Sequence, residues 1–201
     1  MENSLKFSLN SINFQREGSS IVSITFSALS EMRDLARSSQ DIECGGILVG
    51  HNVGRDIEVV AASGAGPNAK QSAAHFLRDT GYCREFLARR YQESGADYVG
   101  EWHSNVVGLH HLSAGDLNTL VGILVDPDYD FVSFAVVLVI VGGKDLELLV
   151  YVAETAKELY RRRIVISELY RGKFPEPTSG APDPESPGTR PPCPTDFPTR
   201  C

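Results

Sequence analysis

The sequence lacks the features that would direct it to a membrane, to nucleic acid or to a disulfide-bonded fold. Its longest apolar run, residues 134–141, is much shorter than the ~20 residues of a transmembrane helix. With 19 basic and 26 acidic residues, the net charge is -7, so there is no basic excess to bind phosphate backbones or anionic lipid. The 4 cysteines have no CxxC spacing, which predicts reduced thiols. We therefore expect neither nucleic acid nor a membrane as a partner.

The chain also starts without a charged segment followed by an apolar stretch, so a cytoplasmic location is expected. Proline is scarce before residue 175, whereas residues 175–201 hold 9 of the 11 prolines. Such a segment buries too little apolar area to offset the entropy of ordering. The sequence predicts one domain over residues 1–174 and a disordered Pro-rich tail over residues 175–201.

The spacing of apolar residues predicts a domain that mixes helices and strands. Alternation and short β-rich runs predict strands at 21–26, 45–50, 57–62, 97–103, 131–142 and 144–153. Helical spacing predicts helices at 28–38 behind a Ser27 cap, at 82–93 and at 114–125. Residues 154–169 combine a helix-favouring part with a strand-favouring part, so the sequence does not decide between helix and strand there.

Residue types that bind zinc are concentrated near the predicted strand at 97–103. His103 and Asn105 are two positions apart, so both point to the same face, while Trp102 points away into the core. Asp116 lies in the first turn of the next predicted helix and can turn back toward the strand. Catalytic zinc takes imidazole nitrogens and carboxylate oxygens and keeps one position for water. The spacing predicts a zinc site with His103 and Asp116 as ligands.

A base for such a water is available at Glu43, which precedes the glycine-flanked apolar strand at 45–50. Partial burial there would tune the carboxyl group for proton transfer. Cys44 is interpreted as a small buried residue, because no histidine pairing supports a nucleophile. His75 is interpreted as a surface or core-edge histidine and Glu101 as structural.

Glu43, His103-Ser104 and Ser113-x-x-Asp116 match the JAMM motif in residue type, order and spacing. The flanking stretches Glu-Cys-Gly-Gly-Ile-Leu-Val-Gly and Tyr-Val-Gly-Glu-Trp-His-Ser are similar to bacterial JAB-domain sequences. Over roughly residues 20–150, the chain resembles the JAMM (JAB1/MPN/Mov34) metalloprotease family. This resemblance implies a cytidine-deaminase-like α/β fold, in which helices flank a curved, mostly antiparallel sheet.

The resemblance also implies a function. A single Zn²⁺ would activate water, Glu43 would transfer its proton to the leaving amine, and Ser113 would bind the oxyanion. The bond would be an amide or isopeptide bond at the C-terminal tail of a ubiquitin-like protein or of a small bacterial sulfur-carrier protein. Taken alone, Ser113-x-x-Asp116 is also a helix capping box.

Two positions depart from the motif, since Val106 replaces a proline and Asn105 replaces the second histidine ligand. An amide oxygen is a weaker zinc ligand than imidazole. His110 or His111, in the following loop, are candidate substitute ligands. Two functions therefore stay open, a metal-dependent hydrolase and a catalytically silent module that binds a ubiquitin-like or carrier protein. Nothing in the sequence indicates an oligomeric state.

Overall fold

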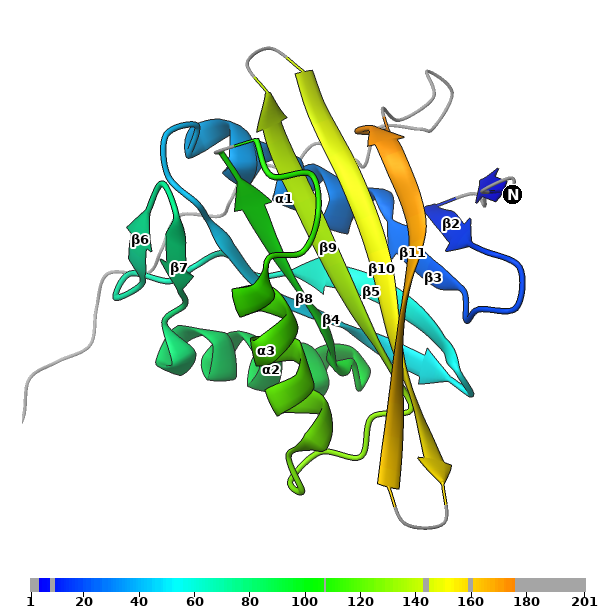
Figure 1. Cartoon of the computed structure of the whole chain (residues 1–201). Helices are drawn as coiled ribbons and strands as arrows, with labels where there is room; N and C mark the ends of the chain where they lie inside the picture. The colour runs from blue at the N-terminus through cyan, green and yellow to red at the C-terminus, as the bar shows by residue number, and fades with distance from the viewer. Residues whose placement is uncertain (1–3, 8–9, 107, 143–144, 159–160, 176–201) are drawn as a thin grey trace, which may run out of the picture.

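A nine-stranded sheet organises the domain (Figure 1). The computed structural model describes residues 4–7, 10–106, 108–142, 145–158 and 161–175, and the predicted tail beyond residue 175 lies outside them. Within these described residues, the strand order is β1-β2-β3-β5-β4-β8-β9-β10-β11, with parallel pairs only at β3–β5 and β8–β9. The strands are Ser4–Phe7 (β1), Ser11–Gln15 (β2), Val22–Thr25 (β3), Gly45–Val53 (β4), Asp56–Ala62 (β5), Asp97–Asn105 (β8), Ser133–Gly142 (β9), Asp145–Glu158 (β10) and Arg161–Lys173 (β11).

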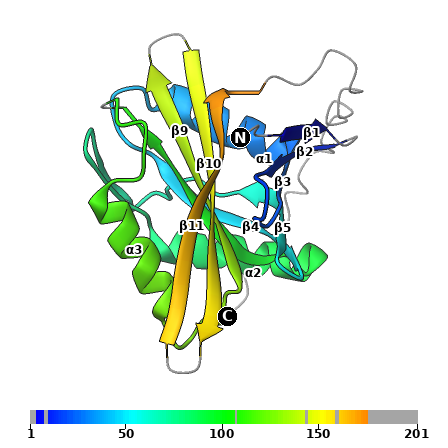
Figure 2. The same ribbon diagram turned by 45° about the vertical axis from the view of Figure 1, so that its right-hand side comes forward.

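Helices cover both faces of this sheet. Strand β9 is buried almost throughout, and alternate residues belong to different apolar clusters. Helix α1 (Phe26–Ser38) packs on the face that includes Val137, whereas α3 (Ala114–Val125) packs on the face that includes Leu138. Figure 2 shows α1 and α3 on opposite sides of β9 and β10. Helix α2 (Thr80–Ser94) lies on the same side as α3, against β4 and β5.

The sheet curves until its two ends approach each other. The rings of Phe14 on β2 and Tyr170 on β11 have centroids 5.3 Å apart. A small separate hairpin, β6 (Lys70–Ser72) with β7 (His75–Leu77), follows β5. The predicted curved, mostly antiparallel sheet with flanking helices is therefore confirmed. No helix within the described ranges is long and apolar enough to span a membrane.

Most predicted elements are present, but the start of α1 is corrected. The helix begins at Phe26, and its cap is Thr25, whose hydroxyl accepts a hydrogen bond from the Ala28 N–H at 3.3 Å. Ser27 lies within the first turn. The reason is local, since Thr25 keeps an extended conformation (φ -65°, ψ 151°) and its hydroxyl already reaches the third helical residue.

The segment left open at residues 154–169 forms strand wherever the structure describes it. The pairing of β10 with β11 runs from Glu147 opposite Lys173 to Glu158 opposite Arg161. The local helix propensity of residues 156–158 is overridden because these residues belong to this antiparallel ladder. The connection between the strands predicted at 131–142 and 144–153 lies outside the described residues, which exclude 143 and 144.

The junction between β4 and β8 positions the candidate site. Gly45 pairs with His103 in an antiparallel register. A Cβ at Gly45 would lie 2.9 Å from the Cα of His103 and closer still to the Trp102 carbonyl oxygen. A glycine is therefore required for the start of β4 to approach the end of β8, which brings Glu43 near His103.

Candidate metal centre and acid-base pocket

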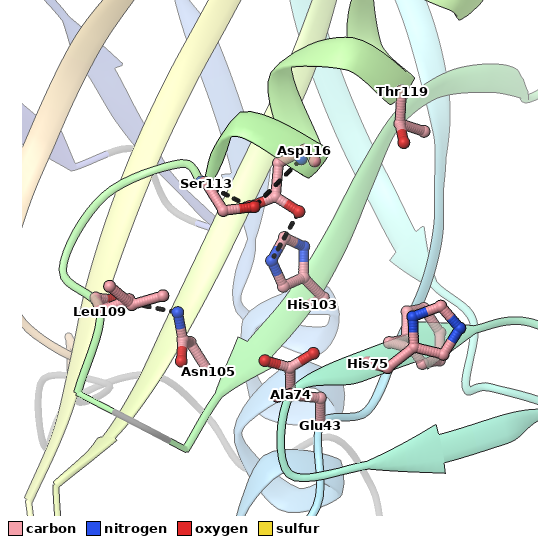
Figure 3. A pocket seen from close by; sticks show the side chains of 11 residues that line it. Glu43, Ala74, His75, His103, Asn105, Leu109, Ser113, Asp116 and Thr119 are labelled. Carbon is pink, nitrogen blue, oxygen red and sulfur yellow. Dashed lines mark hydrogen bonds and ion pairs between the residues drawn. The ribbon is translucent and has the colours of Figure 1, made fainter.

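Five of the predicted site residues, Glu43, His103, Asn105, Ser113 and Asp116, line one pocket of about 310 Å³ (Figure 3). The residues that line it come from four parts of the chain: the segment before β4, the β6–β7 hairpin, the end of β8 with its following loop, and the start of α3. The lining residues are Glu43, Ala74, His75, Phe76, His103, Asn105, Leu109, Ser113, Gly115, Asp116 and Thr119.

Strand β8 presents alternate side chains to the pocket, as predicted. His103 and Asn105 face it, while Trp102 and Ser104 point into the core. Trp102 is only 1% exposed, and its indole N–H donates to the Ser63 carbonyl at 2.8 Å. The Ser104 hydroxyl accepts from the Cys44 N–H at 3.0 Å and so ties β8 to the chain directly after Glu43. These buried bonds fix the strand that carries His103.

Cys44 and Glu101 have the structural roles that the sequence suggested. Cys44 is buried, and this burial raises the pKa of its thiol, so the unreactive thiol form is favoured. Glu101, two residues before His103 on β8, forms an ion pair with Arg78 and accepts a hydrogen bond from the Tyr98 hydroxyl at 2.7 Å. Arg78 directly follows β7, so this ion pair joins the hairpin end to β8.

His103 and Asp116 face each other across the pocket. The Nε2 atom of His103 lies 3.6 Å from Oδ1 of Asp116. Burial lowers the pKa of His103, and the nearby Asp116 charge opposes this only in part. The neutral imidazole is therefore favoured, which is the form that binds a metal ion.

Asp116 has two roles, one for each carboxylate oxygen. Its Oδ2 accepts a hydrogen bond from the Ser113 N–H at 2.7 Å, and the Ser113 hydroxyl accepts from the Asp116 N–H at 3.1 Å. This is the complete capping box of α3. The other oxygen, Oδ1, is the atom nearest His103. The capping box therefore leaves Oδ1 of Asp116 on the side of His103.

Glu43 is held at the pocket by the β6–β7 hairpin. Its N–H donates to the Ser72 carbonyl at 2.9 Å, and its carbonyl accepts from the Gln71 amide at 2.9 Å. Burial raises the pKa of the Glu43 carboxyl, and the negative charge of Asp116 raises it further. A carboxyl group with a raised pKa holds a proton more readily than an ordinary one, which suits it to take and return a proton.

Asn105 occupies the position of the expected second histidine ligand. It is buried, and its Nδ2 donates to the Leu109 carbonyl at 3.0 Å. This bond assigns the orientation of the amide and fixes the start of the loop that leads to α3. At this position the chain therefore presents a neutral amide in place of an imidazole.

The spacing of the two strong donors matches a zinc site. Two ligands about 2.0 to 2.2 Å from zinc in a tetrahedral site lie about 3.3 to 3.6 Å apart, and the His103–Asp116 separation is 3.6 Å. Among the described residues, however, no group of three or more His, Cys, Asp and Glu side chains could hold a metal. The donors fit a metal bound by His103 and Asp116, and the missing third strong ligand predicts weak affinity.

The two candidate substitute ligands are not brought to the pocket. His110 and His111 are exposed in the loop before α3, and neither lines the pocket. The Nδ1 atom of His110 instead lies 3.0 Å from the Glu147 carboxylate on β10.

His75 lines the pocket although the sequence placed it outside the motif. It is exposed on β7, and Figure 3 shows its ring across the pocket from Asn105. The other lining residues absent from the sequence analysis are Ala74, Phe76, Leu109 and Thr119. No local pattern in the sequence indicates that this segment folds over the site.

Comparison with known proteins agrees with this architecture. The profile of the family described as prokaryotic homologs of the JAB domain matches residues 26–152. The solution structure of protein DSY2949 from Desulfitobacterium hafniense is similar at 19% identity, with a TM-score of 0.53, over 73% of this chain and 88% of that one. A Salinibacter ruber protein shares 22% identity over 79% of this chain and 94% of that one, with a TM-score of 0.40. No curated protein matches. Because the profile spans most of the chain, the protein belongs to the prokaryotic JAB-domain family.

Proposed function

We propose that the protein is a metal-dependent hydrolase that cleaves an amide or isopeptide bond at the C-terminal tail of a small ubiquitin-like or carrier protein. The observation that carries this proposal is the convergence of Glu43, His103, Ser113 and Asp116 in one pocket. His103 and Asp116 would hold the metal, which supplies Lewis-acid polarisation of the scissile carbonyl and lowers the pKa of water.

Glu43 is the proton carrier in this proposal. Its raised pKa and its place at the pocket wall allow it to accept a proton from the attacking water. It then gives that proton to the leaving amine as the carbon–nitrogen bond breaks. The hairpin contacts from Ser72 and Gln71 hold the backbone of Glu43 during both transfers.

In this proposal, Ser113 stabilises the developing negative charge. Its oxygen accepts the Asp116 N–H, so the hydroxyl proton remains to be donated. A hydrogen bond to the oxyanion that forms only in the transition state increases the rate of the chemical step.

A second function, binding without hydrolysis, is supported by Asn105. A neutral amide replaces an imidazole there, and its Nδ2 is engaged by Leu109. If the metal affinity is too low for the site to be loaded, the same pocket would hold a protein tail without cutting it. Both functions use the same partner class, and they differ in whether the bond is cleaved.

Cleavage at saturating metal tests the proposal. The probes are ubiquitin with an aminocoumarin amide at its C-terminus and a bacterial sulfur-carrier protein with a C-terminal extension, each incubated with the full chain and excess zinc. We expect release of the coumarin or the extension by the unaltered chain, and its loss in Glu43→Gln and after chelation. Binding without cleavage by the unaltered chain, with cleavage by Asn105→His, would establish the silent module instead.

A further inference from the structure

An apolar stripe runs along the exposed side of α3, which is unusual for a surface helix. Leu117, Val121 and Val125 are 37%, 41% and 52% exposed, and they follow one another at four-residue intervals. We refer to these three residues as the α3 stripe. Leu120 and Leu124 on the opposite side pack into the core, so they account for the attachment of the helix to the sheet. Figure 2 shows α3 on the outside of β9 and β10.

The second helix on this side of the sheet has a different surface. The exposed side of α2 carries Arg84, Glu85, Arg89 and Glu93, which is the usual charged solvent face. Helix α3 has one charged residue in twelve, Asp116, and that residue belongs to the pocket. The contrast indicates that the α3 stripe is covered by another molecule in the functional state.

The α3 stripe begins at the pocket and ends at carboxylates. Leu117 directly follows Asp116, and the stripe extends along the helix for about 12 Å at about 1.5 Å per residue. Beyond Val125 come Asp126 and Asp128, where Oδ1 of Asp126 accepts the Asp128 N–H at 2.9 Å. In the described part of the chain, neither aspartate forms an ion pair. A partner lying along α3 would therefore meet an apolar strip with negative charge at its far end.

We propose that the α3 stripe docks the folded body of the same small protein whose C-terminal tail enters the pocket. This inference rests on the proposed function for the identity of the partner. The docking face of that protein is apolar and is bordered by Lys or Arg, which complement Asp126 and Asp128. The tail and the body would then bind at adjacent places, and the body contact would raise the local concentration of the tail.

Two other occupants match the surface less well. A second copy of the chain would bring the same aspartates to the interface, where like charges oppose association. Residues 176–201 of the chain itself contain four acidic and two basic residues, so they would meet the aspartates with net negative charge. A partner whose apolar face is bordered by Lys or Arg has neither disadvantage.

The test compares a whole protein with its tail alone. The probes are ubiquitin and a bacterial sulfur-carrier protein, each also supplied as a synthetic peptide of its C-terminal tail, and dissociation constants are measured on the full-length Glu43→Gln chain to prevent turnover. We expect Val121→Asp to weaken binding of the whole protein about tenfold or more while the affinity for the tail peptide is unchanged. Gln92→Asp adds the same charge to the exposed side of α2 and should change neither affinity.

The outcomes separate the two proposals. Unchanged binding of the whole protein by Val121→Asp, or equal affinity for the whole protein and its tail, overturns the docking role of α3. Whole-protein binding that depends on Val121 but shows no tail contribution supports the docking face and contradicts the proposed pocket function. If Val121→Asp alters the sedimentation of the chain alone, the α3 stripe is a self-association surface and the proposal is wrong. Absence of binding by both probes overturns both proposals.

Discussion

One side of the pocket has the group expected for its role, whereas the other side lacks one expected metal ligand. On the acid side, the backbone of Glu43 is held at both its N–H and its carbonyl by the β6–β7 hairpin, and the carboxyl group has a raised pKa. On the ligand side, His103 and Asp116 face each other at 3.6 Å, but Asn105 offers an amide where an imidazole is expected. On both sides the backbone holds the site residues at the pocket. On the ligand side, one donor group differs from the expected imidazole.

The comparison shows that the residues which fix the positions of the site side chains differ from the residue that changes the metal-donor atoms. The glycine contact of β4 with β8, the buried Trp102 and the capping box of α3 fix where the side chains are. None of these contacts involves the side chain of Asn105. A change at that residue can therefore alter metal affinity while leaving these three contacts in place, although its own bond to the Leu109 carbonyl is lost.

The largest expected effect is on the acid side. Glu43→Gln keeps the size of the side chain and removes its ability to carry a proton, so we expect kcat to fall about 10²- to 10⁴-fold. Metal affinity should stay within a small factor, because Glu43 is not one of the proposed ligands. Activity that survives in this variant would show that the acid side is not catalytic.

Asp116→Asn tests the ligand side next. The amide oxygen can still cap α3, while the charged metal donor is lost. We expect metal affinity to fall at least about 10- to 100-fold, the loss typical of residues that only orient a ligand, with little change in the free energy of unfolding. Asp116→Ala should add about 1 kcal/mol of destabilisation, because the Ser113 N–H loses its acceptor. Equal zinc affinity in Asp116→Asn and the unaltered chain would rule out Asp116 as a ligand.

A smaller effect is expected from the contact that positions Glu43. Gln71→Ala removes one hydrogen bond to the Glu43 carbonyl, worth about 1 kcal/mol, so kcat should decrease about fivefold. Metal affinity should not change, and Gln92→Ala on the exposed side of α2 is the matched control. If Gln71→Ala alters metal binding as much as kcat, the two sides of the pocket are not independent.

The smallest expected effect is a pH dependence of stability. Because the pKa of Glu43 is raised above its ordinary value of 4.5 in the fold, the folded state holds this proton more tightly than the unfolded state. The resulting stabilisation is present below pH 4.5 and is lost as the pH rises through the raised pKa. Without metal, Glu43→Gln should therefore melt at a higher temperature than the unaltered chain at pH 7, and the difference should shrink toward pH 4. A difference that is constant with pH would contradict burial of this carboxyl group.

Much of the site could be predicted because its residues are local in sequence. The alternation along β8 placed His103 and Asn105 together, and Ser113-x-x-Asp116 marked the start of α3 by its capping chemistry. The pairing of Glu43 with these residues could be predicted only through the resemblance to a known motif. Its physical cause, the close approach of Gly45 to His103, involves residues 58 positions apart.

The parts that could not be predicted depend on contacts between distant segments. His75 reaches the pocket because the β6–β7 hairpin folds back on Glu43 through the Ser72 carbonyl, and no local pattern indicates this contact. Residues 154–158 and 161–169 are strand because β10 and β11 pair along their length, which outweighs local helix propensity. Helical spacing of the apolar residues predicted α3, but only the structure separates its buried from its exposed apolar residues.

Zinc titration of the unaltered chain beside Asn105→His, with His103→Ala as the control, tests the central claim most directly. The account predicts that the unaltered chain binds one zinc weakly, that Asn105→His binds it about 10- to 100-fold more tightly, and that His103→Ala binds none. Cleavage should follow zinc occupancy in both of the binding proteins. If the unaltered chain binds no more zinc than His103→Ala at any concentration, and zinc appears only with Asn105→His, the protein is not a zinc hydrolase and the silent module is correct.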